Sequence, residues 1–61
     1  MKLTRYAYYA DQNDRATVKV VKTEIEAESI AAAYASRESE PKHIPGYDTL
    51  NWIIVLNGSR V

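Results

Sequence analysis

The sequence predicts a small α+β domain in which a β-β-α-β chain forms a three-stranded antiparallel sheet with one helix packed on one face. Three segments are rich in β-branched or aromatic residues, and a segment with apolar residues at helical spacing lies between the second and the third. Runs of turn-forming residues separate the first two strands and the helix from the last strand. Because a chain of 61 residues can enclose only one small core, residues 1–61 are expected to be a single domain.

The first two expected strands form a hairpin. Residues 3–10 include three tyrosines and end at residues 11–14, Asp-Gln-Asn-Asp, which favour a turn. Residues 16–26 follow as the second strand, but their apolar positions change parity between Val20 and Val21. A β-bulge at that point would account for the change of buried face.

The helix is expected to run from Ile30 to about Glu38, with Ser29 as its N-cap. Residues 23–26, Thr-Glu-Ile-Glu, also fit a capping box, so a start near Thr23 stays open. The later start is favoured because residues 18–25 are rich in β-branched side chains, which suit a strand better than a helix.

A loop and a strong strand complete the chain. Residues 39–48 hold both prolines and one of the two glycines, so neither helix nor strand is expected there. Residues 49–57 form the strongest strand, and Asn57-Gly58 ends it with a turn that leaves residues 59–61 as a short tail. If this strand pairs with the first, the sheet order is 2-1-3 and every neighbouring pair is antiparallel.

The last strand is apolar on both faces, and one short helix can cover only one of them. Leu50, Trp52, Ile54 and Leu56 share one parity, whereas Ile53 and Val55 share the other. Which face the helix covers stays open. Exposed apolar patches on small proteins mark interfaces, so we expect one on the uncovered face. Association with a partner or with a second copy, as a homodimer made sheet to sheet or edge to edge, is favoured over the alternative that the loop of residues 39–48 folds back over it. The expected apolar interface residues are Tyr6, Tyr8, Ile53 and Val55.

Charge is segregated along the chain although the net charge is zero. Residues 1–22 carry five cations and two aspartates, residues 23–40 carry five glutamates and one arginine, and residues 41–61 carry two cations and one aspartate. Local charge distribution, rather than the sum, determines the field that a partner meets. The acidic segment therefore predicts docking on a basic surface of a partner protein, and Glu28 also suits a helix N-terminus. The candidate residues for this acidic contact are Glu24, Glu26 and Glu28.

The residue types needed for catalysis or for cofactor binding are sparse. The single histidine, His43, lies between two prolines, and no glycine-rich phosphate-binding motif is present. Carboxylates at period two on a strand are more typical of a solvated stripe than of a metal site or an acid–base pair. We therefore expect a non-enzymatic protein without metal or cofactor. The absence of cysteine and of an apolar leader favours the cytoplasm, and the longest apolar run, residues 52–56, is too short to span a membrane.

A second functional class is a single-stranded nucleic-acid-binding protein. Tyr6 and Tyr8 on a sheet face, together with Arg5 and Lys19, would offer stacking surfaces and phosphate contacts. The five glutamates of residues 23–40 weigh against it, because phosphate binding depends on unopposed cations. Protein binding is therefore favoured.

Residues 25–33, Ile-Glu-Ala-Glu-Ser-Ile-Ala-Ala-Ala, resemble the strand-to-helix junction of the small RNA polymerase inhibitors encoded by T7-like phages. The β-β-α-β order is also similar to theirs, and small anti-CRISPR proteins are similar in size and element order. The resemblance implies an inhibitor that docks acidic residues, here Glu24, Glu26 and Glu28, on a nucleic-acid-handling protein in the host cytoplasm. The last strands differ, since the family carries arginines where this chain has Trp52 to Leu56.

Overall fold

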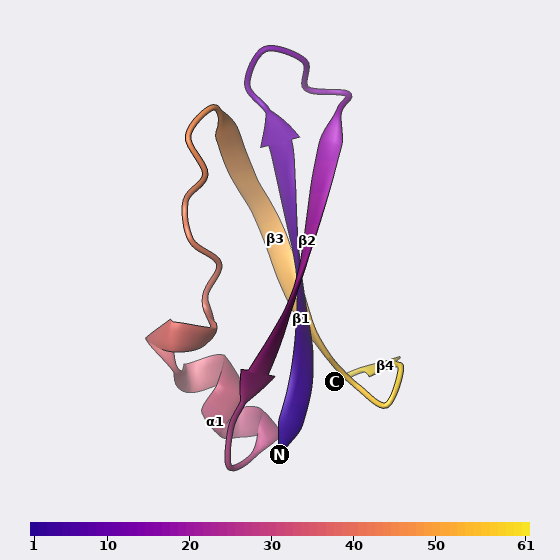
Figure 1. Cartoon of the computed structure of the whole chain (residues 1–61), viewed down its shortest axis with the longest axis vertical. Helices are drawn as coiled ribbons and strands as arrows, with labels where there is room; N and C mark the ends of the chain where they lie inside the picture. Colours follow the sequence, from indigo (N-terminus) through magenta and orange to yellow (C-terminus); the bar gives the residue numbers. More distant parts are fainter.

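A four-stranded antiparallel sheet of order β2-β1-β3-β4 forms the body of the protein, and a short helix packs at one end of it (Figure 1). The structure, a computed structural model, describes residues 1–61. The elements in chain order are β1 (Lys2–Asp11), β2 (Val18–Glu26), α1 (Ile30–Ala35), the 3-10 helix η1 (Arg37–Ser39), β3 (Tyr47–Leu56) and β4 (Ser59–Arg60). The predicted α+β class, the β-β-α-β order and the central position of the first strand are confirmed.

The β1-β2 hairpin pairs without interruption, from Lys2 opposite Glu26 to Ala10 opposite Val18. The bulge expected at Val20-Val21 is therefore wrong. β2 is an edge strand, and its side chains are at least partly exposed on both faces. The change of apolar parity therefore does not indicate a change of buried face. The irregularity lies instead in β3, where the register with β1 shifts between Tyr8 and Tyr9 and leaves Leu50 as the extra residue.

The helix begins where the later of the two predicted starts placed it. Ser29 is the N-cap, and its hydroxyl oxygen accepts a hydrogen bond from the Ala32 backbone N–H at 3.0 Å. Thr23 lies within β2, which excludes the earlier start. α1 ends at Ala35, before the expected Glu38, and the chain continues as η1. No helix in the structure has the length and apolar character needed to cross a membrane.

The C-terminal residues form a fourth strand, so the prediction of a three-stranded sheet was wrong. Asn57 and Gly58 both have positive φ, 52° and 82°, as a tight two-residue hairpin turn requires. The turn brings Ser59 opposite Leu56 and Arg60 opposite Val55. A two-residue strand is too short to show an alternating pattern, which is why these residues read as a tail.

The core lies between α1 and one face of the sheet. Leu3, Ala33 and Ile54 are its fully buried members, and Trp52 packs against them while stacking on the Tyr34 ring at a centroid distance of 5.8 Å. The loop after η1 lies on the same face, because the Tyr9 hydroxyl donates a hydrogen bond to the Lys42 carbonyl at 2.9 Å. This loop consequently does not cover the opposite face, contrary to the alternative considered from the sequence.

Candidate functional site

The sheet presents one uncovered face, which we call the open face. Strand pairing places Tyr6 of β1 between Lys22 of β2 and Ile53 of β3, and directly opposite residues in adjacent strands point to the same side of the sheet. The odd-numbered residues of β1 face the core, so the even-numbered ones and their partners face away from it. The open face includes Lys2, Thr4, Tyr6, Tyr8, Val18, Val20, Lys22, Glu24, Glu26, Asn51, Ile53 and Val55.

All four side chains predicted as the apolar interface lie together on the open face. Tyr6, Tyr8, Ile53 and Val55 are half-buried by one another and by the sheet. The valines of β2 extend this surface, since Val20 is 52% exposed and Val18 is 48% exposed. These valines were not predicted as interface residues, although their shared parity with Tyr8 across the hairpin could have indicated it.

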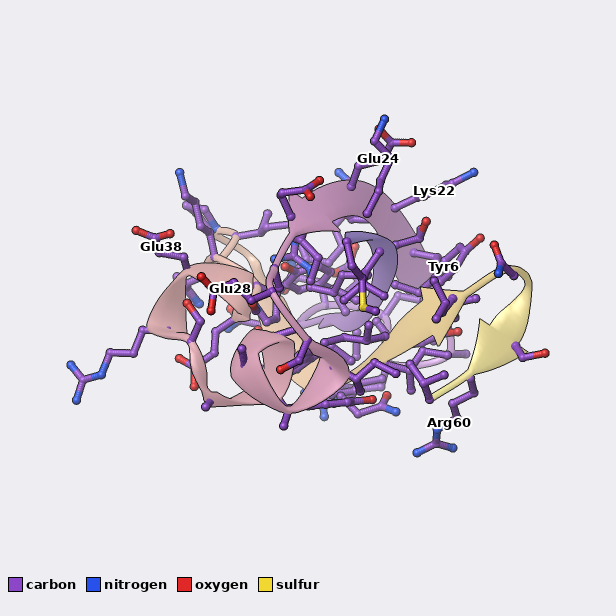
Figure 2. The ribbon with its side chains drawn as sticks, turned by 90° about the horizontal axis from the view of Figure 1, so that it is seen from below. Tyr6, Lys22, Glu24, Glu28, Glu38 and Arg60 are labelled. Atoms are coloured by element: carbon purple, nitrogen blue, oxygen red, sulfur yellow. The ribbon has the colours of Figure 1, made fainter.

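The three predicted acidic contact residues do not form one surface. Glu24 and Glu26 both lie on the open side of β2, but Glu24 makes no ion pair, whereas the Glu26 carboxylate accepts a hydrogen bond from the Met1 amino group at 2.9 Å. That bond, reinforced by the positive charge of the amino group, lowers the pKa of Glu26 below its ordinary value. Glu28 precedes the N-cap, and Figure 2 shows it on the helix side of the molecule with Glu38, pointing away from Glu24.

The cations that the nucleic-acid hypothesis invoked lie on the covered face. Arg5 is only 8% exposed, and its guanidinium donates hydrogen bonds to the Ser39 carbonyl and to the Thr23 hydroxyl, both at 3.1 Å. The Lys19 ammonium lies 5.5 Å from the centroid of the Tyr47 ring. The cation directly opposite Tyr6 is instead Lys22, whereas Arg60 of β4 lies opposite Val55 and projects away from Tyr6 (Figure 2).

Asp48, at the start of β3, is bonded to the turn between β1 and β2. Its carboxylate accepts hydrogen bonds from the Gln12 amide, at 3.0 Å, and from the Arg15 guanidinium. These two donors, in that order, lower the pKa of Asp48 below its ordinary value. These hydrogen bonds therefore join the start of β3 to the β1-β2 turn, and they depend on the Asp48 carboxylate being ionised.

This ion pair predicts an acid-sensitive share of stability. Because the folded state lowers the pKa of Asp48, the contribution is present above the ordinary pKa of 3.8 and is lost as the pH falls through the lower folded value. Asp48→Asn should lower the melting temperature slightly at neutral pH, and the difference from wild type should shrink as the pH falls below 3.8. Thermal melts across the acid range measure it, and a difference independent of pH would contradict the assignment.

The remaining polar groups do not assemble a reactive site. His43 is exposed in the loop between the two prolines and makes no hydrogen bond to a serine or an aspartate. No three or more His, Cys, Asp or Glu side chains lie close enough together to hold a metal ion. A hollow of about 340 Å³ lies on the covered face beside β2, with Arg5 and Lys42 balanced in its wall by Glu38 and Glu40. Its mixed lining favours no ligand of one charge.

Comparisons with protein-family models, with curated proteins and with solved structures find no match to this chain. The surface of the sheet is therefore the feature from which function is inferred. Its defining property is a sheet covered on one side by α1, η1 and the following loop and left bare on the other.

Proposed function

We propose that this chain is a non-enzymatic protein-binding module that uses the open face as its contact surface. The observation that carries the proposal is that Tyr6, Tyr8, Ile53 and Val55 lie together on a sheet face that no other element covers. Contiguous exposed apolar surface is uncommon on small monomers and is typical of interfaces. Tyrosine suits such a role because its ring buries apolar area while its hydroxyl stays hydrated.

Charge at the margin of the open face supports a protein partner over nucleic acid. Lys22 is the cation opposite Tyr6, and Glu24 lies in the same strand as Lys22, two residues away. This mixture does not supply the several unopposed cations on which phosphate affinity depends. Glu24, which makes no ion pair, is available for a basic group of the partner. The narrowest form of the proposal is a phage-type inhibitor whose partner is a host protein that handles nucleic acid.

Substituting one tyrosine on each face tests the proposal. Tyr8 lies on the open face, whereas Tyr34 of α1 is 42% exposed on the covered side. We expect Tyr8→Ala to weaken capture of a bacterial partner by about tenfold or more, the range expected for an aromatic residue central to an interface. Tyr34→Ala should leave capture unchanged. The readout is the amount of one defined protein retained from bacterial lysate by the immobilised chain, quantified by mass spectrometry.

The control variant Tyr34→Ala is expected to lose more folding stability than Tyr8→Ala. Tyr34 also stacks on Trp52 and donates a hydrogen bond to the Val61 carbonyl, so Tyr34→Ala removes more native contacts than Tyr8→Ala does. A loss confined to Tyr8→Ala consequently cannot be ascribed to unfolding. Equal capture by both variants would refute the open face as the contact surface. Retention of labelled single-stranded oligonucleotides at low salt, abolished by Tyr8→Ala, would favour the nucleic-acid alternative.

A further inference from the structure

β2 is a long edge strand whose outer edge has no partner. It pairs with β1 on one side only, and its nine residues contain no proline, no glycine and no bulge. Natural proteins usually interrupt, cover or charge an edge of this kind, because its free N–H and C=O groups accept another strand. β2 carries Lys19, Lys22, Glu24 and Glu26, so its edge is open only to a strand that pairs with these charges.

The hydrogen bonds to β1 determine which residues of β2 face this free edge. The Asp11 N–H donates to the Thr17 carbonyl at 3.1 Å, and the Ala27 N–H donates to the Met1 carbonyl at 3.0 Å. In an antiparallel ladder, residues that bond one neighbour alternate with residues that face the other way. Odd-numbered residues of β2 thus bond β1. The residues whose backbone groups point to the free edge are Val18, Val20, Lys22, Glu24 and Glu26.

This alternation leaves few ways for two copies of β2 to pair antiparallel about a two-fold axis. Even-numbered residues must lie opposite even-numbered ones, so the axis passes through a single residue of each copy. An axis at Lys22 or at Glu24 puts like charges directly opposite each other, which is destabilising. An axis at Val21 leaves Lys22 opposite Val20, with no charge partner.

An axis at Thr23 pairs the two charges at the centre of the edge and leaves only Glu26 opposite Val20. Lys22 then lies opposite Glu24 of the second copy, and the symmetry repeats this pair. On the covered side Thr23 meets Thr23 and Val21 meets Ile25, pairs that favour strand association. Figure 2 shows Lys22 and Glu24 both projecting outward from β2.

We propose that the chain forms a homodimer by antiparallel pairing of two β2 edges about an axis through Thr23. The two sheets then join into one, and both open faces lie on the same side of it. In this dimer Glu24 pairs with Lys22 of the second copy, so it does not contribute a contact to the partner protein, which the open-face tyrosines then bind without it. Because the pairing uses the edge of β2 and leaves Tyr6 and Tyr8 uncovered, it stands or fails independently of the Tyr8 experiment.

Charge reversal tests the pairing. Lys22→Glu and Glu24→Lys each place like charges opposite one another twice, so each should raise the dimer dissociation constant at least tenfold in sedimentation equilibrium. An equimolar mixture of the two variants restores both opposite-charge pairs and should form a heterodimer, which native mass spectrometry distinguishes by mass. Lys19→Glu makes the same charge change at a position opposite Ala27 and should not alter dimerisation. A monomeric wild type, or no heterodimer in the mixture, would overturn the proposal.

Disulfide trapping tests the register. The chain has no cysteine, and residues at a non-hydrogen-bonded site of an antiparallel pair have Cα atoms about 4.5 Å apart, within the range for a disulfide. Thr23→Cys should therefore form a covalent dimer under mild oxidation. Val21→Cys should stay monomeric under denaturing, non-reducing electrophoresis, because its own counterpart lies several residues away. Cross-linking through position 21 instead of 23 would exclude an axis at Thr23.

Discussion

Replacing Ile54 with alanine is expected to leave little of the chain folded. Ile54 is fully buried between Leu3 and Ala33, at the contact of α1 with the sheet. Truncating a buried isoleucine to alanine removes about 2–5 kcal/mol of stability. A single core in a chain of this size rarely supplies more than about 3–5 kcal/mol, and only six apolar residues are buried here. The loss therefore approaches the whole free energy of unfolding.

The neighbouring isoleucine gives a matched control. Ile53 follows the same backbone but points to the open face, where it is only half-buried. Ile53→Ala should cost about 1 kcal/mol or less, because little of its surface leaves water on folding. Urea unfolding followed by Trp52 fluorescence and by circular dichroism measures both variants. Equal losses at the two positions would show that a second layer covers the open face in solution.

The contrast between Ile53 and Ile54 also shows what the sequence could predict about the fold. Period-two alternation separated these residues correctly onto opposite faces, and Ser29 correctly indicated the start of the helix. Alternation alone could not decide which face α1 covers, since both faces of β3 are apolar. That choice depends on the segment after α1, which reaches back over Tyr9 through a long-range contact with Lys42.

The surface residues were predictable to a similar degree. The four apolar interface candidates lie together because strand parity and pairing determine their positions. The acidic segment does not lie together, because Glu24 is on a strand whereas Glu28 follows the turn of the chain towards α1. Closeness in sequence therefore predicted a larger continuous acidic surface than the structure has. The burial of Arg5 was also not predicted. A charged side chain in a strand is normally expected to face solvent, and the sequence does not indicate that this one faces the core.

Arg5 is the second position at which a large effect is expected. Its guanidinium is buried, has no carboxylate within ion-pair distance, and leaves its Nε without a hydrogen-bond partner. A buried cation costs several kcal/mol in desolvation unless it is fully paired, and two neutral acceptors, the Ser39 carbonyl and the Thr23 hydroxyl, offset only part of that cost. The side chain therefore fills space at the expense of an incompletely compensated charge.

Volume and charge can be separated at this position by two substitutions. Arg5→Met keeps most of the volume and removes the charge, so it should be at least as stable as wild type in urea unfolding. Arg5→Lys keeps a buried charge, but its single nitrogen replaces the two guanidinium nitrogens that separately reach the Ser39 carbonyl and the Thr23 hydroxyl, so it should be less stable by about 2 kcal/mol. If Arg5→Met were less stable than Arg5→Lys, the Arg5 guanidinium would be paired with a carboxylate in solution. The carboxylates placed to pair with it are Glu38 and Glu40, which share the adjacent hollow with Arg5.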